Sequence, residues 1–346
     1  MQEKSFLIQN AWNNVTPKDW PYKARKHMRP SEIGMPFIDR WCSMNAIPIT
    51  NPFTQRTLRI FQAGNVIEYI VLRSLALSGL LHSSQQWLEL KETPEHLGMK
   101  GRLDATIGGF VDWDDARRRV DANLAEFAHS LDEDVIAAKS TAIIEDLKKR
   151  FPKGFKEQII VEVKSINSMA FHNSKGNKDS DGDFKGYDHN KAQLYSYLEM
   201  AKTRVGLLVY ISKDDFCMAE VPVRHDDKEV ADAFWHDIQE MSRLYRADEM
   251  PKKEPEISFN QRNGKFETNW SVGRSLYLTY LYGYESQDAY EKSWHYKLLD
   301  VNRALRHLRV EKVKKEDIPV IEEWKLNDFV KFEGDGGSEQ EEVDAE

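Results

Sequence analysis

Residues 158–166, QIIVEVKSI, decide the fold of this chain. The run is rich in β-branched residues and predicts a strand at the centre of a sheet. Side chains two apart in a strand share a face, so Glu162 and Lys164 lie side by side while Val163 points into the core. A Glu-x-Lys pair alone is common and is most often a surface salt bridge. In so apolar a run, however, its charges need a site or a compensating partner, because burying an unpaired charge is costly.

The segments on either side of this strand alternate between helical and strand patterns. Apolar residues at helical spacing predict a long, largely buried helix over residues 57–81. GRLDATIGG, residues 101–109, predicts a strand running into a turn, and residues 167–190 predict a long loop. The other expected helices are a pair within 114–150, then 191–202, 226–247 and 287–308, and the other expected strands are 205–211 and 216–222. This alternation indicates an α/β fold.

Composition places the chain among soluble globular proteins. Its 346 residues are 40% hydrophobic and 31% charged, a composition that excludes a disordered or fibrous chain. They include 49 Lys and Arg and 57 Asp and Glu, which gives a formal net charge of -8. Cys42 and Cys217 are too few for a disulfide framework, a four-thiolate zinc site or an iron–sulphur cluster, and are expected to be small core residues. With no apolar run of about 18 residues and no signal peptide, we expect a cytoplasmic protein without a membrane partner.

The negative charge is concentrated at the C-terminus. The last fourteen residues, 333–346, hold seven acidic side chains and no basic one, and predict a disordered tail. Subtracting seven from 57 leaves 50 acidic against 49 basic residues in the rest of the chain. Five basic residues near the N-terminus lie beside Trp20 and Tyr22, namely Lys18, Lys23, Arg25, Lys26 and Arg29. This stretch either contacts phosphates or is a solvated surface segment. Because seven of the acidic residues lie in the tail, the overall charge does not argue against a nucleic-acid partner.

Further polar residues fall around the predicted central strand. Asp104 follows the turn GRL onto a strand and can converge with Glu162. Two carboxylates and a backbone carbonyl are ligands that Mg2+ and Mn2+ prefer. Glu68, in the apolar stretch NVIEYIVL, is either an additional metal ligand or an exposed helical glutamate. Gln193 and Tyr197 are one helical turn apart and share a face, although a Q-x-x-x-Y pair is a weak signal by itself.

Taken together, these motifs resemble those of a known family. The order G-x-x-x-E ending at Glu68, G-x-x-D ending at Asp104, E-x-K at 162–164 and Q-x-x-x-Y at 193–197 is similar to the PD-(D/E)XK nuclease superfamily, in its RecB-like and lambda-exonuclease-like branch. The motifs cover roughly residues 60–210. The resemblance implies an α/β core with a central mixed β-sheet flanked by helices, a helical insertion, and helical and aromatic terminal extensions.

The resemblance also bears on cofactors and origin. Glu68 stands where iron–sulphur members often carry a histidine, so the chain is more similar to the viral exonucleases, which leaves a viral origin open for this intracellular protein. Met35 stands where cluster-bearing relatives place their first cysteine, which implies a member without an iron–sulphur cluster. His172 and His189 lie near the motifs and are expected to form hydrogen bonds rather than to bind a metal.

The activity that the resemblance implies is Mg2+- or Mn2+-dependent cleavage of DNA, by an exonuclease acting at DNA ends in recombination, repair or replication. The implied metal ligands are Asp104, Glu162, the Val163 carbonyl and Glu68, and the implied catalytic residues are Lys164, Glu68, Gln193 and Tyr197. Alternatives are a structure- or site-specific endonuclease, and a non-cleaving subunit that binds DNA ends or a protein. We expect DNA and a recombination or replication protein as partners, while polarity, strand preference and oligomeric state stay open.

Four segments are expected along the chain. They are an N-terminal extension 1–55, a nuclease core 56–250 with a helical insertion at 111–152, a helical and aromatic extension 251–332, and the acidic tail 333–346. The insertion follows from the 58-position gap between Asp104 and Glu162, which is longer than a hairpin needs. It would gate a DNA channel, bind a partner or simply enlarge the fold.

Overall fold

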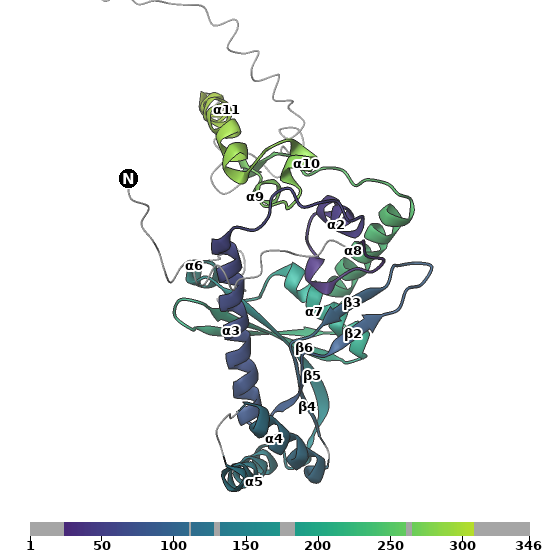
Figure 1. Ribbon diagram of the computed structural model, residues 1–346, viewed down its shortest axis with the longest axis vertical. Helices are drawn as coiled ribbons and strands as arrows, with labels where there is room; N and C mark the ends of the chain where they lie inside the picture. The colour runs from purple at the N-terminus through teal and green to yellow at the C-terminus, as the bar shows by residue number, and fades with distance from the viewer. Residues whose placement is uncertain (1–23, 111, 128–131, 174–183, 261–264, 308–346) are drawn as a thin grey trace, which may run out of the picture. The chain divides into compact units, whose positions relative to one another are not determined.

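The computed structural model describes residues 24–110, 112–127, 132–173, 184–260 and 265–307 (Figure 1). The acidic tail lies outside these ranges, as does the N-terminal stretch up to residue 23 with Trp20 and Tyr22. The chain divides into two compact units, which we describe separately. Among the described residues, the first unit comprises 24–46 and 53–251, and the second comprises 47–52 and the residues from 252 onward.

The first unit is built on a mixed five-stranded sheet with the strand order β1-β4-β5-β6-β7. Its strands are β1 (Leu81–Ser84), β4 (Ala105–Phe110), β5 (Phe155–Ile166), β6 (Val205–Ser212) and β7 (Met218–Arg224). Neighbouring strands are antiparallel except for β5 and β6, which run parallel. The expected α/β architecture, with a central mixed sheet flanked by helices, is therefore present, and β5 contains the predicted central strand.

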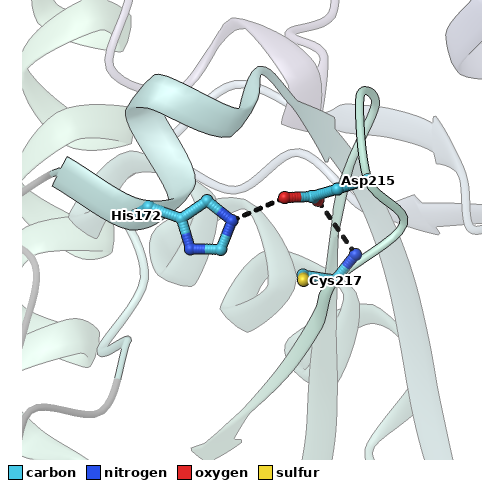
Figure 2. A group of neighbouring side chains, drawn as sticks. All are labelled: His172, Asp215 and Cys217. Carbon is cyan, nitrogen blue, oxygen red and sulfur yellow. Dashed lines mark hydrogen bonds and ion pairs between the residues drawn. The ribbon is translucent and has the colours of Figure 1, made fainter.

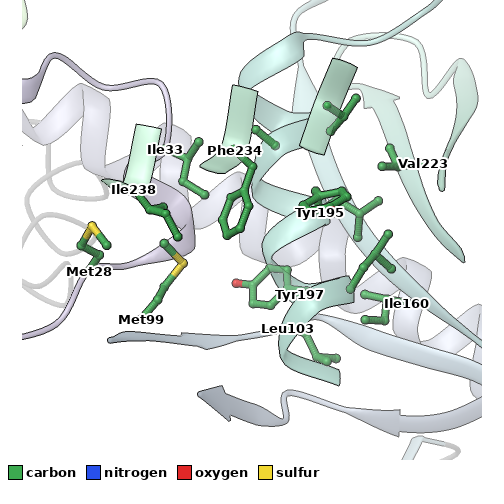
Figure 3. Close-up of a cluster of buried hydrophobic side chains, with 14 of the residues drawn as sticks. Met28, Ile33, Met99, Leu103, Ile160, Tyr195, Tyr197, Val223, Phe234 and Ile238 are labelled. Atoms are coloured by element: carbon green, nitrogen blue, oxygen red, sulfur yellow. The ribbon is translucent and has the colours of Figure 1, made fainter. Parts of the chain in front are cut away.

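The helices of the first unit are η1 (Pro30–Glu32), α2 (Phe37–Met44), α3 (Gln55–Leu77), α4 (Trp113–Phe127), α5 (Glu133–Arg150), α6 (Ser168–Asn173), α7 (Asp188–Ala201) and α8 (Lys228–Arg246). They cover both faces of the sheet. Ile160 of β5 packs with α7 and α8 in the cluster drawn in Figure 3, whereas Val161 packs with α3 on the opposite face. Because alternate residues of a strand share a face, Glu162 and Lys164 lie on the α7 face.

Helix α3 differs from its prediction in burial. The Thr54 side chain caps its start by accepting from the Thr57 N–H (3.2 Å). One stripe that includes Ile67 and Val71 is buried against the sheet, but Val66 is 59% exposed. The prediction of a largely buried helix is wrong, because a helix lying on a sheet turns only one stripe toward it. Among the described helices, α3 alone is long and apolar enough to cross a membrane, a weak criterion that core helices of soluble proteins also meet.

Helices α4 and α5 occupy the connection between β4 and β5, where the sequence predicts a helical pair. They enclose an apolar cluster that includes the fully buried Leu147 and the nearly fully buried Leu124. Phe110 of β4 is buried in the same cluster, and Phe155 of β5 packs against it. The insertion therefore has its own core, which is continuous with one end of the sheet.

A bent hairpin runs along the edge of the sheet. β1 is followed by β2 (Trp87–Leu90), and β3 (Met99–Arg102) is followed by β4, so that β2 pairs with β3 while β1 pairs with β4. At the break between the two pairs, the Gln85 N–H donates to the Asp104 carbonyl (2.9 Å), and Gln85 has a φ of 54°. The strand expected over 101–109 is therefore two strands, and its last two glycines lie within an irregular part of β4 rather than in a turn.

The loop expected over residues 167–190 contains regular structure at both ends, because α6 begins at Ser168 and α7 begins at Asp188. Cys42 is buried in α2 as expected. Cys217 is exposed, and its prediction as a core residue is wrong, because it lies in the turn between β6 and β7.

The second unit contains an antiparallel pair that the sequence pattern does not predict, β8 (Ile257–Asn260) with β9 (Lys265–Thr268). Its helices are α9 (Trp270–Gly273), α10 (Leu278–Tyr282) and α11 (Gln287–His307), of which α11 matches the helix expected over 287–308. A small core buries Val272, Leu278 and Tyr290. The Glu256 carboxylate accepts hydrogen bonds from the Tyr284 hydroxyl (2.6 Å) and the Trp294 indole (2.8 Å).

Candidate functional site

The break in the hairpin places Asp104 against β5. The ladder between β4 and β5 extends to the pair Ala105 and Val161, and the Asp104 side chain continues it by accepting from the Val163 N–H (2.8 Å). Asp104 therefore lies between β3 and β4 rather than within a strand, which corrects the expectation. Irregularities of this kind re-aim a side chain next to a site. The N–H and C=O of one residue in a strand point the same way, so the Val163 carbonyl faces the Asp104 side of β5.

Glu162 is 4% exposed and is held from two directions. Its Oε1 accepts from the Lys164 ammonium (2.8 Å) and from the Gln193 amide (2.7 Å). Its Oε2 is buried without a hydrogen-bond partner among the described residues. A buried carboxylate oxygen without a partner is costly, so this atom is a candidate ligand for a cation.

Lys164 is fixed beside this carboxylate. Its Nζ donates to Glu162 and to the Gln193 Oε1 (2.9 Å). Burial by itself would lower the pKa of Lys164, but the negative charges of Glu162 and Asp104 outweigh burial and raise its pKa. An ammonium has three N–H donors. Two are used here, so one remains for a further acceptor, such as a water or a phosphate oxygen.

Tyr197 lies on α7 one helical turn after Gln193. Its hydroxyl donates to the carbonyl of Arg102 at the end of β3 (3.0 Å), so it braces the strand that precedes Asp104. Burial raises the pKa of Tyr197, and the charges of Glu162 and Asp104 raise it further. The tyrosine therefore stays neutral and serves as a hydrogen-bond donor. In the structure, Tyr197 therefore supports a strand through a hydrogen bond to its backbone.

Glu68 reaches this region from α3, where the Gln85 amide donates a hydrogen bond to it. Burial raises the pKa of Glu68, although the Gln85 hydrogen bond lowers it and the Glu162 charge raises it again. Gln85 was absent from the sequence-based site, because a glutamine in SSQQW carries no motif. Its role depends on the hairpin break, which positions its backbone against Asp104 and its side chain against Glu68.

The carboxylates of Asp104, Glu162 and Glu68 lie close enough to influence one another electrostatically. Burial, followed by the negative charges of Glu162 and Glu68, raises the pKa of Asp104 well above its usual value. A cation would relieve this repulsion and pair the free Oε2 of Glu162. The available donors are carboxylate and carbonyl oxygens, which are the ligands of magnesium and manganese. The residues present therefore fit the ion that the sequence motifs imply.

Two exposed residues flank this group. Trp87 of β2 lies directly across the hairpin from Arg102 of β3, and its side chain is 74% exposed. Arg102 is also exposed and immediately precedes Leu103 and Asp104. This pair was not singled out from the sequence, because Trp87 belongs to no motif and Arg102 occupies a variable position of G-x-x-D.

Comparison with known proteins adds no identification. No protein-family model matches the chain, and no curated protein matches it. Among solved structures, the chain is similar to one described as "Crystal structure of SSO0001", at 15% identity over 68% of this chain and 85% of that chain, with a TM-score of 0.36. A likeness of this size carries no argument about fold or function.

Proposed function

We propose that the first unit is a metal-dependent nuclease that hydrolyses DNA phosphodiester bonds, as an exonuclease acting at DNA ends. The observation that carries the proposal is the buried Oε2 of Glu162, which has no hydrogen-bond partner within the described ranges and lies among three carboxylates and a fixed lysine. The element order α3, β1, β4, β5, α7, β6, with β6 parallel to β5, also agrees with the PD-(D/E)XK core that the motifs suggest.

Each residue has a distinct role in this scheme. Asp104, Glu162 and the Val163 carbonyl would hold Mg2+ or Mn2+, with Glu68 in support. The ion supplies Lewis-acid stabilisation of phosphate charge and lowers the pKa of a bound water. Lys164, with one N–H donor left over, orients the attacking water or offsets the phosphate charge.

The surrounding residues keep this arrangement in place. Gln193 bonds both Glu162 and Lys164, so it fixes the carboxylate and the ammonium relative to each other. Tyr197 holds the strand that leads into Asp104. Both are therefore positioning residues in this scheme, although the motifs imply a catalytic role for them.

DNA itself would be bound next to the carboxylates. Arg102 can contact a phosphate, and the exposed Trp87 across from it can stack on an unpaired base, as in other proteins that bind single strands. Base stacking requires a base outside the duplex. This surface therefore favours a strand end over an intact duplex, and supports an exonuclease over an endonuclease.

The test is cleavage of end-labelled linear DNA with Mg2+ or Mn2+, against a chelator control. We expect Lys164→Ala and Asp104→Asn each to lower the cleavage rate by about 100- to 1,000-fold. Lys202→Ala is the matched control, because Lys202 is 74% exposed and only pairs with Glu199 near the end of α7. Undiminished cleavage by both site variants would sink the assignment.

A second comparison separates the modes of cutting. Covalently closed circles should resist an exonuclease, whereas a linear DNA of the same sequence should be degraded from its ends. Cleavage of the circle would favour the endonuclease alternative. DNA binding with no metal-dependent cleavage of linear, circular or flapped substrates would favour the non-cleaving subunit.

A further inference from the structure

A second group of metal-ligating side chains lies away from the carboxylates. His172 is on α6, and Asp215 and Cys217 are in the turn between β6 and β7 (Figure 2). The His172 Nε2 lies 2.7 Å from the Asp215 Oδ2, and the Cys217 N–H donates to the Asp215 Oδ1 (3.1 Å). One ligand atom from each of the three side chains lies within 4.8 Å of the other two. All three residues are exposed and accessible from solvent.

The turn and α6 are held together independently of these three side chains. The Lys213 N–H donates to the Ile166 carbonyl at the end of β5 (2.8 Å), and the Ser168 N–H at the start of α6 donates to the Asp214 carboxylate (2.8 Å). Phe216, between Asp215 and Cys217, has a φ of 57°. This conformation is strained for a non-glycine residue and persists only where the surroundings impose it. The three ligands are thus presented by a backbone that is already positioned.

We propose that His172, Asp215 and Cys217 form a binding site for a borderline-soft divalent cation of the zinc type, with water completing the coordination; this goes beyond the hydrogen-bonding role expected for His172 from the sequence. The mixture of ligand atoms determines which ion the site prefers. Thiolate, imidazole and carboxylate together suit zinc, which takes four ligands in tetrahedral geometry. Magnesium prefers oxygen alone, so the two sites of this chain would select different ions.

The same geometry argues against a cysteine nucleophile. A reactive thiol needs a neighbouring positive group that stabilises its thiolate. Here the negative Asp215 contacts both other residues: its carboxylate accepts from the Cys217 backbone N–H and is within hydrogen-bond distance of the His172 ring. Slight burial and the Asp215 charge raise the pKa of the Cys217 thiol. A bound cation would displace the thiol proton into solvent and take its place beside the carboxylate.

Binding would fasten α6 to the turn between β6 and β7. α6 directly follows β5, the strand that carries Glu162 and Lys164. The ion would thus connect the ends of the two parallel strands through side chains, in addition to the backbone contact between Lys213 and Ile166. This role is independent of the proposed nuclease activity.

The test is a Co2+ titration of the full chain under reducing conditions, followed by absorption spectroscopy. Thiolate bound to cobalt gives a charge-transfer band in the near ultraviolet, and we expect one such ion per chain, displaced by Zn2+. Cys217→Ser should abolish the band, and His172→Ala should weaken Co2+ affinity by at least about tenfold. Cys42→Ser is the matched control and should keep the band, because Cys42 is the chain's other cysteine and is buried in α2.

Two results would overturn the proposal. One is a wild-type chain without a thiolate band at millimolar Co2+, and the other is a band that persists in Cys217→Ser. Asp104→Asn should leave the band unchanged, since oxygen ligands give no thiolate transition. This variant separates the two sites, because its loss of cleavage bears only on the proposed nuclease function.

Discussion

The two ends of β5 are stabilised by opposite kinds of interaction. Near its start, Phe155 packs with the apolar cluster of α4 and α5, in which Leu124 and Leu147 are buried. Near its end, Glu162 and Lys164 form a buried network of charges in which one carboxylate oxygen finds no partner in the part of the chain that the structure describes. Apolar packing stabilises a fold, whereas buried charge costs free energy unless it is fully compensated. The apolar packing near the start of β5 therefore offsets the free-energy cost of the buried charges near its end.

The largest expected effect concerns the apolar end. Leu147→Ala should lower the free energy of unfolding by about 2–5 kcal/mol, because Leu147 is fully buried and its truncation leaves a cavity. Urea denaturation measures this change. Val135→Ala, on the same helix and 40% exposed, should have little effect. If Leu147→Ala folded but cleaved DNA more slowly than wild type, the apolar packing and the charged site on β5 would not be independent of each other.

Next to the charged end of β5, the exposed indole of Trp87 should contribute to DNA binding. Trp87→Ala should weaken binding of single-stranded DNA by about 1–3 kcal/mol, the usual contribution of one stacked base. Fluorescence anisotropy with a labelled oligonucleotide measures the dissociation constant. Trp270→Ala, which removes a similarly exposed (72%) tryptophan from the second unit, is the matched control. Equal losses in the two variants would remove Trp87 from the DNA-binding surface.

Gln85 should show an intermediate effect on catalysis. Gln85→Leu removes the amide that bonds Glu68 and should reduce cleavage by about tenfold, as for other residues that orient a metal ligand. The neighbouring Gln86 has an exposed side chain, so Gln86→Leu should cleave at the wild-type rate. Initial rates at saturating DNA distinguish the two. An unaffected Gln85→Leu would mean that Glu68 does not support the metal.

Asp104→Asn should separate stability from activity. The asparagine oxygen can still accept from Val163, but one of three mutually repelling carboxylates is removed. In a chelator at neutral pH, we expect the variant to be more stable than wild type by on the order of 1 kcal/mol. Added Mg2+ should raise the melting temperature of wild type but not of the variant. A less stable variant in chelator would contradict the repulsion inferred at this end.

The smallest expected effect is on the pH dependence of stability, through His82 near the apolar end of β5. Burial, followed by the charge of Arg119, lowers the pKa of His82 below its usual 6.5. The unfolded chain therefore takes up a proton more readily than the folded one as pH falls through 6.5. The contribution of neutral His82 to the free energy of unfolding is therefore fully present above pH 6.5 and is lost as the pH falls below it. Melting temperatures from about pH 7.5 to about pH 5.5 should fall more for wild type than for His82→Asn; parallel curves would refute this.

The sequence was informative where chemistry and periodicity coincide in a short segment. β5 could be predicted because Glu162 and Lys164 interrupt an otherwise apolar run, and Gln193 could be placed on the same face because it lies on the following helix. The α/β class follows from the same alternation of segments, although that alternation does not predict β1. These features depend on residues that are close together in the chain.

Other features depend on pairing between distant segments and could not be predicted. Gln85 acts only because the hairpin breaks opposite Asp104, and nothing in SSQQW indicates a positive φ. The exposure of Val66 on α3 depends on what covers that helix, which periodicity does not reveal. The group of His172 with Asp215 and Cys217 requires α6 and a turn more than forty positions away to meet, as the 43-residue separation of its hydrogen-bonded pair shows.

The hydrogen bond from the Val163 N–H to Asp104 makes one backbone amide a natural probe of this region. Other amides of β5 are protected from deuterium exchange by neighbouring strands, but this one is protected by a side chain. Its exchange rate therefore reports how long that carboxylate stays in place. Isotope exchange at a single peptide group could then follow ion occupancy and carboxylate motion without any DNA present.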